Sequence, residues 1–153
     1  MMHSSVHIRP ASFADLGQVS SLFDQYRVYY GQASDPAGAK QFLFDLMERR
    51  ESVIYLAIDS ERENVVGFAQ MYPVFSSLSM RRVWILNDLF VAGDLRGQGI
   101  GRRLLAAVTE YAALTKAKGI QLETGVENKG AQKLYERLGF VRDDEFYHYF
   151  LNL

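Results

Sequence analysis

A glycine-rich segment at residues 96–101, RGQGIG, is the part of the chain whose residue types and spacing indicate chemistry most strongly. It lies between a predicted strand and a predicted helix. Glycines allow backbone N–H groups to turn toward a ligand, because no Cβ stands in the way. The N-terminus of the following helix adds a partial positive charge. The segment is therefore expected to bind a diphosphate.

Three alternative interpretations of this segment are open, and the residues after the glycines disfavour two of them. A P-loop requires Lys and then Ser or Thr after its last glycine, whereas Gly101 is followed by Arg102 and Arg103. A dinucleotide-binding fingerprint requires a third glycine or an alanine, and Arg102 or Leu104 stands at that position. In the third alternative, the glycines only form a tight turn.

The chain resembles the GNAT superfamily of N-acetyltransferases. Residues 96–101 are similar to its pyrophosphate-binding pattern of Gln or Arg, two residues, Gly, one residue, and Gly or Ala. Residues 128–140 match a second pattern, Asn-x-x-Ala-x-x-x-Tyr-x-x-x-Gly-Phe. The opening residues 8–12 (IRPAS), residues 66–69 (VGFA) and the strand before the glycines also match in order.

This resemblance covers nearly the whole chain and implies an acetyl-coenzyme A-dependent N-acetyltransferase. It implies an α/β fold of the α+β type with a mixed, mostly antiparallel sheet. The sheet is expected to splay at a bulged coenzyme-binding strand and to be flanked by about four helices. Residues 1–153 are expected to form a single domain of this kind.

Residues for coenzyme binding also follow from the resemblance. Backbone N–H groups of residues 98–102 are expected to bind the pyrophosphate. The backbones of Leu89 and Val91 are expected to pair with the pantetheine arm. Asn128 is expected to hydrogen-bond the pantetheine, and Ala131 keeps its helix close to it. The full predicted set is Leu89, Phe90, Val91, Arg96, Gly97, Gln98, Gly99, Ile100, Gly101, Arg102, Asn128, Ala131 and Tyr135.

Acetyl transfer to an amine requires a neutral amine and a protonated leaving thiol. An alkylamine has a pKa near ~10, so a group must accept a proton, whereas a thiol of pKa ~8.5 needs only a weak acid. The resemblance places Tyr135 beside the sulfur and makes it the candidate acid. The alternative is a packing role, because Tyr135 lies on the apolar face of its predicted helix.

Residues 87–91 (NDLFV) resemble the diamine branch of the superfamily, the spermidine/spermine type, which carries a glutamate and then an aspartate here. Asn87 replaces the glutamate and cannot usefully accept a proton. Asp88 matches the second acid and is the candidate base. Adjacent strand residues face opposite ways, so Asp88 need not replace the glutamate. A water chain that carries the proton, or a purely structural Asp88, remains an alternative.

Three tyrosines, Tyr26, Tyr29 and Tyr30, lie near the end of the first predicted helix, where the superfamily builds its acceptor site. Aromatic faces together with Asp24 or Asp35 could hold a cation; packing and helix capping are the alternatives. The expected acceptor is a small primary amine, polyamine-like or amino-acid-like. A protein lysine or N-terminus, and a non-catalytic acyl-CoA sensor, are the competing possibilities. The predicted substrate-binding set is Tyr26, Tyr29, Tyr30, Asn87 and Asp88.

Composition restricts the function classes further. The formal net charge of −1 disfavours a general nucleic-acid partner. The chain has no cysteine, so disulfides and thiolate chemistry are excluded and a cytoplasmic location is expected. No apolar run is long enough for a membrane span, and no metal is expected. His3, His7 and His148 are expected to be surface or packing residues. A homodimer is expected from the resemblance alone.

The hydrophobic pattern predicts the helices and strands that position the candidate site residues. Their expected order is β-α-α-β-β-β-α-β-α-β. Ser12 and Asp15 predict a capping box at the first helix, and Asp35 with Pro36 predicts the start of the second. The expected strands comprise residues 6–9, 53–59, 65–72, 83–91, 120–124 and 146–151. The later helices are expected to end near Lys118 and to span residues 131–138.

Overall fold

A computed structural model describes residues 5–153 as two compact units, one ending at Leu122 and the other comprising Glu123–Leu153. The first unit contains the sheet and three α-helices, and the second contains α4 (Lys129–Arg137) and the C-terminal tail. The expectation of one domain over residues 1–153 stays a prediction. His3 lies outside the described residues.

A five-stranded sheet with the order β1-β2-β3-β4-β5 forms the centre of the first unit. Neighbouring strands pair antiparallel, except β4 and β5, which run parallel. The predicted mixed and mostly antiparallel α/β architecture is therefore confirmed. The strands are β1 (Val6–Pro10), β2 (Val53–Asp59), β3 (Asn64–Ser76), β4 (Arg81–Val91) and β5 (Gly119–Gln121).

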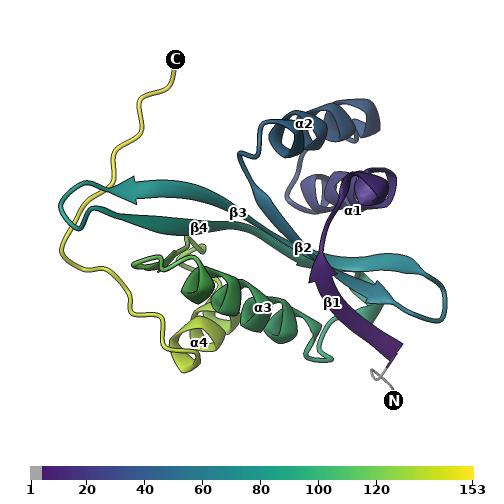
Figure 1. The fold of residues 1–153 in the computed structure, drawn as a ribbon. Helices are drawn as coiled ribbons and strands as arrows, with labels where there is room; N and C mark the ends of the chain where they lie inside the picture. Colours follow the sequence, from purple (N-terminus) through teal and green to yellow (C-terminus); the bar gives the residue numbers. More distant parts are fainter. Residues whose placement is uncertain (1–4) are drawn as a thin grey trace. The chain divides into compact units, whose positions relative to one another are not determined.

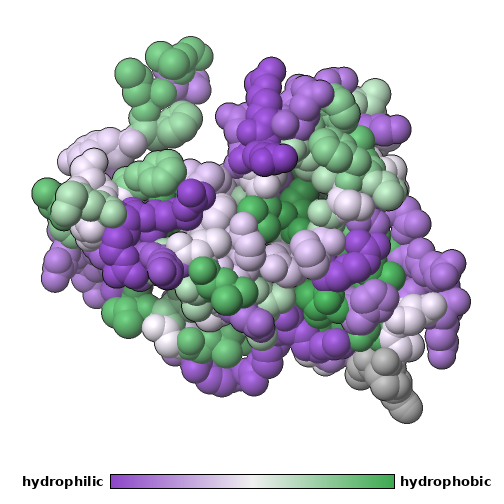
Figure 2. Space-filling model, viewed as in Figure 1, coloured by the Kyte–Doolittle hydropathy of each residue, from purple (hydrophilic) through white to green (hydrophobic). Residues whose placement is uncertain are grey.

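Helices cover both faces of this sheet. Figure 1 shows α1 (Leu16–Tyr29) and α2 (Pro36–Glu48) over one face and α3 (Ile100–Leu114) under the other. Hydrophobic side chains are visible beneath α1 and α2 in Figure 2, where these helices meet the sheet. The buried cluster at this contact comprises Leu16, Val19, Leu22, Phe23, Ala39, Leu43, Ile54, Leu56, Ile58, Phe68 and Phe90.

Local signals in the sequence fix the starts of α1 and α2. Asp15 accepts the backbone N–H of Ser12 at 2.8 Å, which completes the predicted capping box on a short 3-10 turn, Phe13–Asp15, before α1. Asp35 accepts the backbone N–H of Gly38 at 3.0 Å at the start of α2. Both predicted helix starts are confirmed.

Several predicted boundaries are wrong, and local structure explains two of them. The strand expected at residues 120–124 is β5, Gly119–Gln121. The expected loop after residue 72 is a continuation of the β3–β4 hairpin. Phe75 lies opposite Arg82, and the Arg82 guanidinium lies 5.3 Å from the Phe75 ring centroid, which stabilises this extension. The helix α3 ends at Leu114 rather than near Lys118, because Lys116 adopts a left-handed backbone with φ of 59°.

The predicted last strand at residues 146–151 is also wrong, because the described chain forms no strand there. The side chain of Tyr149, for example, is 93% exposed. The alternating pattern of aromatic residues indicates that a segment suits a strand, but it does not supply a partner for its backbone groups.

A bulge in β4 decides which face of the sheet carries the side chains near the predicted site. Gln70 lies opposite Asp88, but the next β3 residue, Met71, lies opposite Leu86, so Asn87 is the extra residue. An extra residue moves the following side chains to the other face. Trp84 therefore packs on Tyr111 of α3, whereas the side chains of Asp88 and Phe90 face Tyr26 of α1.

The close approach of α3 to the sheet depends on Gly67. A Cβ at this position would lie 3.1 Å from the Phe90 carbonyl oxygen and 3.4 Å from Leu104. Gly67→Val should therefore lower the free energy of unfolding by about 2–3 kcal/mol through overpacking. Urea denaturation measures the change. Gly17→Val is the matched control, because a Cβ there would meet nothing within 4 Å. Equal stability of the two variants would contradict this packing argument.

Candidate active site

The glycine-rich segment adopts the open, left-handed geometry that its composition predicts. Gly97 has φ of 78° and Gly99 has φ of 83°, a backbone region that favours glycine. A Cβ added at Gly97, Gly99 or Gly101 would meet nothing within 4 Å, so the space beside this backbone is open. A ligand can therefore approach the main chain of the loop closely.

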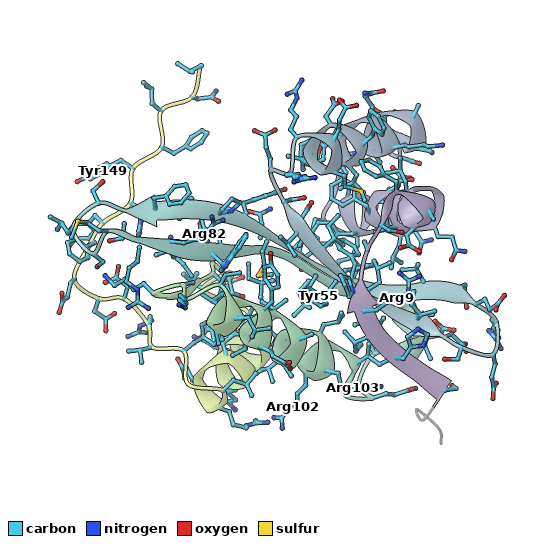
Figure 3. The ribbon with its side chains drawn as sticks, in the orientation of Figure 1. Arg9, Tyr55, Arg82, Arg102, Arg103 and Tyr149 are labelled. Carbon is cyan, nitrogen blue, oxygen red and sulfur yellow. The ribbon has the colours of Figure 1, made fainter. Side chains whose placement is uncertain are left out.

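The N-terminus of α3 follows this loop directly. Gly99 is the N-cap residue, and Arg103 is the first residue whose N–H bonds back to it, at 3.1 Å. The N–H groups of residues 100–102 consequently have no acceptor within the helix. Figure 3 shows Arg102 and Arg103 on the outer side of α3, pointing away from the sheet. The arrangement combines N–H donors, a helix dipole and two exposed cations, which suits a diphosphate.

Strand β4 has an unpaired edge next to this loop. β5 pairs only with Val83, Trp84 and Ile85, although β4 continues as far as Val91. β5 thus ends at Gln121, opposite Ile85 and just before the bulge at Asn87. The edge of residues 86–91 is therefore unpaired with β5, and an extended ligand could add to this edge as a strand would.

Backbone alternation determines which residues of β4 face that edge. Ala92 donates its N–H to the Val66 carbonyl at 2.8 Å, toward β3. Successive strand residues direct their backbone groups to alternate edges. The groups of Phe90 therefore point toward β3, and those of Leu89 and Val91 point toward the unpaired edge. Both of these residues were predicted to pair with the pantetheine arm.

Arg96 connects the glycine loop to the end of α1. Its guanidinium carbon lies 4.5 Å from the ring centroid of Tyr29 and 4.9 Å from that of Phe90. Its Nε donates to the Val91 carbonyl oxygen at 2.9 Å. The Arg96 guanidinium thus already covers one face of the Tyr29 ring, and this contact contributes to the shape of the glycine loop.

Asp88 is a buried carboxylate in the middle of the sheet, with 5% of its surface exposed. Its Oδ2 accepts from Nε2 of Gln70 at 2.8 Å, and its Oδ1 accepts from Nδ2 of Asn87 at 3.1 Å. Within residues 5–153, no Lys, Arg or His side chain forms an ion pair with it. A buried carboxylate without a cationic partner is unusual and costly, which marks Asp88 as a candidate functional group.

Two phenols share this environment. Burial raises the pKa of Tyr26, and the nearby charge of Asp88 and a hydrogen bond to it raise it further. Burial and the charge of Asp88 raise the pKa of Tyr72 in the same way. Both phenols therefore stay protonated at neutral pH, and neither can act as a base. Among these groups, the Asp88 carboxylate is the one that can accept a proton.

The three predicted acceptor tyrosines differ in their surroundings. The Tyr26 ring packs against Phe68 and Phe90 in the core, and its phenol faces Asp88. Tyr29 and Tyr30 are largely exposed, at 61% and 62%. Of the three, Tyr26 is therefore the tyrosine that the fold brings to the buried carboxylate.

Asp24 and Asp35, the acids expected beside these tyrosines, form hydrogen bonds in the connection between α1 and α2. Asp24 accepts from the Ser34 hydroxyl and from the Asp35 N–H, each at 2.7 Å. These hydrogen bonds lower the pKa of Asp24, the bond from Ser34 contributing most. The Asp35 side chain caps α2. Asp24 thus ties α1 to the connection before α2, and both carboxylates already have partners.

In the second unit, Asn128 and Tyr135 lie at the two ends of α4. Oδ1 of Asn128 accepts the backbone N–H of Ala131 at 3.2 Å, so this residue caps the helix. The Tyr135 ring packs edge-on against Phe140 at 5.7 Å. Their predicted roles toward the pantetheine and the thiol stay predictions.

Gln70 and Tyr72 are members of the Asp88 environment that the sequence analysis missed. Nε2 of Gln70 donates to the Tyr72 hydroxyl at 3.2 Å as well as to Asp88. A polar glutamine inside the otherwise apolar run of β3 is the signal that could have identified this position.

The two histidines in the described residues lie outside this environment. His7 bonds to Ser60, and His148 lies near Asp143.

Between residues 5 and 153, no three His, Asp or Glu side chains are grouped to hold a metal ion. None of the helices described there has the length and apolar character needed to cross a membrane.

Known proteins resemble this chain over most of its length. A model of the acetyltransferase (GNAT) family matches residues 19–140. The uncharacterized N-acetyltransferase YhfO of Bacillus subtilis is 46% identical over 97% of this chain and 98% of its own length. The D-amino-acid N-acetyltransferase HPA3 of Saccharomyces cerevisiae is 30% identical over 60% of this chain and 57% of its own length.

A solved structure shares the fold closely. The crystal structure of a probable acetyltransferase superposes with a TM-score of 0.91 and 43% identity, covering 96% of this chain and 97% of the other. The chain therefore belongs to the acetyltransferase (GNAT) family, and it is an N-acetyltransferase by relationship as well as by fold.

Proposed function

We propose that this protein transfers an acetyl group from acetyl-CoA to the primary amine of a small cationic molecule. The observation that carries the proposal is the buried Asp88 carboxylate, which has no cationic partner among residues 5–153. A buried charge is stabilised when an opposite charge joins it. An acceptor that arrives as an ammonium ion supplies this charge.

The coenzyme half of the site consists of the glycine loop and the unpaired edge of β4. Backbone N–H groups of residues 98–102 bind the diphosphate, supported by the positive φ angles of Gly97 and Gly99. Leu89 and Val91 pair with the pantetheine arm, supported by the alternation of β4. The contributions of Asn128, Ala131 and Tyr135 rest on the family resemblance.

When bound, acetyl-CoA supplies the acetyl carbon: a new N–C bond forms, the C–S bond breaks, and the departing sulfur takes a proton. Asp88 holds the ammonium and then accepts its proton. This transfer requires a direct hydrogen bond from the reacting nitrogen to the carboxylate. Asn87, bonded to Oδ1 of Asp88, fixes the orientation of the carboxylate.

Tyr135 protonates the departing sulfur in this proposal. Tyr135→Phe should lower kcat by roughly 10²-fold, a typical effect of losing a general acid, with the affinity for acetyl-CoA little changed. Rapid-quench kinetics under conditions where the chemical step limits the rate provide the measurement. Tyr147→Phe, on an exposed tyrosine of the same unit, is the control. A Tyr135→Phe variant with the kcat of the unaltered protein would assign this residue to packing.

Small amines are preferred over long polycations in this proposal. Residues 87–91 resemble the diamine branch, but Asn87 removes one of the two acids found there. A single buried carboxylate suits a short diamine or a lysine-like compound better than spermine. The relative HPA3, named for D-amino acids, is consistent with an amino-acid-like acceptor. A protein lysine or N-terminus is the alternative acceptor, and a non-catalytic acyl-CoA sensor is the alternative function.

An acceptor panel tests the proposal. The rate of thiol release from acetyl-CoA is measured with short monoamines, diamines, lysine, D- and L-amino acids, spermine and a lysine-containing peptide. The fastest turnover is expected with a short diamine or a lysine-like compound. Faster turnover with the peptide or spermine would contradict the acceptor class. Tight binding of acetyl-CoA without turnover on any amine would favour the sensor.

The proposal extends to the setting of this activity. The absence of cysteine suits a reducing cytoplasm. A homodimer and a single functional domain rest on the family resemblance. Sedimentation of the purified protein measures the oligomeric state directly.

A further inference from the structure

Gln70 carries a buried acceptor atom that has no hydrogen-bond partner among residues 5–153. The residue is completely buried, with 0% of its surface exposed. Its Nε2 donates to Oδ2 of Asp88 at 2.8 Å and to the Tyr72 hydroxyl at 3.2 Å, but its Oε1 bonds to nothing. An unsatisfied buried carbonyl is costly and calls for an explanation.

The chemistry of the neighbours fixes which end of this amide is the unpartnered one. Oδ2 of Asp88 accepts a hydrogen bond at this contact, and only the NH₂ group of Gln70 can donate one, so that group faces Asp88. Turning the amide over would place two acceptor oxygens against each other. Oε1 is therefore the free atom, and it is held in place by the two hydrogen bonds that Nε2 donates.

We propose that Oε1 of Gln70 receives an N–H of the acceptor amine and makes the site selective for primary amines; this inference rests on the proposed acetyl transfer. An ammonium ion has N–H donors for both Asp88 and Gln70. After Asp88 accepts one proton, a neutral primary amine still has two N–H groups. One of them bonds to Oε1 of Gln70, which orients the nitrogen lone pair.

The proposal predicts a difference between primary and N-methylated amines. A neutral secondary amine keeps a single N–H. It can therefore donate to Oε1 of Gln70 in fewer orientations that also direct its lone pair at the acetyl carbon. The unaltered protein should use a primary amine with a kcat/KM at least roughly 10-fold above that of its N-methyl analogue. Equal values for the two acceptors would overturn the proposal.

Gln70→Met tests the residue itself, because methionine has a similar volume and no hydrogen-bonding amide. The kcat/KM for the primary amine should fall by roughly 10- to 100-fold, chiefly through KM, and the preference over the N-methyl analogue should shrink. The KM for acetyl-CoA should not change. Gln18→Met is the matched control: Gln18 also bonds to the protein, at Val65, but outside the Asp88 environment.

Gln70→Glu keeps the size of the side chain and tests the contact with Asp88 if the methionine variant does not fold. Two carboxylates at these positions must share a proton, so the acidic limb of the pH profile of kcat/KM should move to higher pH. An unchanged pH profile in Gln70→Glu would overturn the contact.

Unaltered amine kinetics in a folded Gln70→Met would overturn the proposal while acetyl transfer stands. No turnover by the unaltered protein would instead overturn the proposed function.

Discussion

Replacing Gly99 by valine should weaken acetyl-CoA binding by roughly 10³-fold and leave the protein folded. Gly99 has φ of 83°, which a β-branched residue adopts only at a cost. The loop would relax away from this geometry, and the backbone N–H groups before α3 would no longer converge. Strain and the loss of a hydrogen bond to a charged group together amount to about 4 kcal/mol.

Isothermal titration calorimetry with acetyl-CoA measures this loss on protein whose folding has been checked by circular dichroism. Gly93→Val is the matched control: Gly93 lies in the same connection, its φ is not positive, and a Cβ there would meet nothing within 4 Å. Unchanged affinity in Gly99→Val would remove the glycine loop from the coenzyme site.

Replacing Asp88 by asparagine should lower kcat/KM for the amine by roughly 10³-fold. Asparagine keeps the size of the side chain and can still accept a hydrogen bond from Gln70, but it removes the buried negative charge. The loss follows from the ammonium losing its counter-charge in a desolvated site, which costs about 3–5 kcal/mol. The affinity for acetyl-CoA should change little, because the glycine loop is unaffected.

Steady-state kinetics with the preferred amine, together with a melting curve, provide the measurement for Asp88→Asn. Asp24→Asn is the control, because Asp24 is equally a buried aspartate that accepts two hydrogen bonds, yet it serves the α1–α2 connection. This control should lose stability without a specific loss of amine kinetics. An Asp88→Asn variant with an unaltered kcat/KM would leave Asp88 a structural role only.

Features that depend on short stretches of chain could be predicted from the sequence. The capping box of Ser12 and Asp15 and the start of α2 at Asp35 involve residues only three apart. The glycine loop also follows from local conformational needs. The predicted strand at residues 53–59 agrees with β2 (Val53–Asp59) because its two ends are marked by polar turns.

Features that depend on pairing between distant residues could not be predicted in this way. The family resemblance implies a bulged strand, but the position of the bulge at Asn87 is defined only by the register of β3 and β4, and it brings Asp88 to the face of α1. The polarity of Gln70 in an apolar run marks that position, but spacing along the chain does not show that Gln70 and Tyr72 meet Asp88 across the two strands. The contact of Arg96 with Tyr29 likewise joins the glycine loop to a distant helix.

The measurement that tests the central claim most directly is the mass balance of a single reaction. The protein is incubated with acetyl-CoA and a short diamine, and free coenzyme A and the N-acetylated amine are quantified together by mass spectrometry. The two products should appear in equal amounts, and both should disappear in Asp88→Asn. Release of coenzyme A without acetylated amine, or no product with any primary amine, would contradict the central claim.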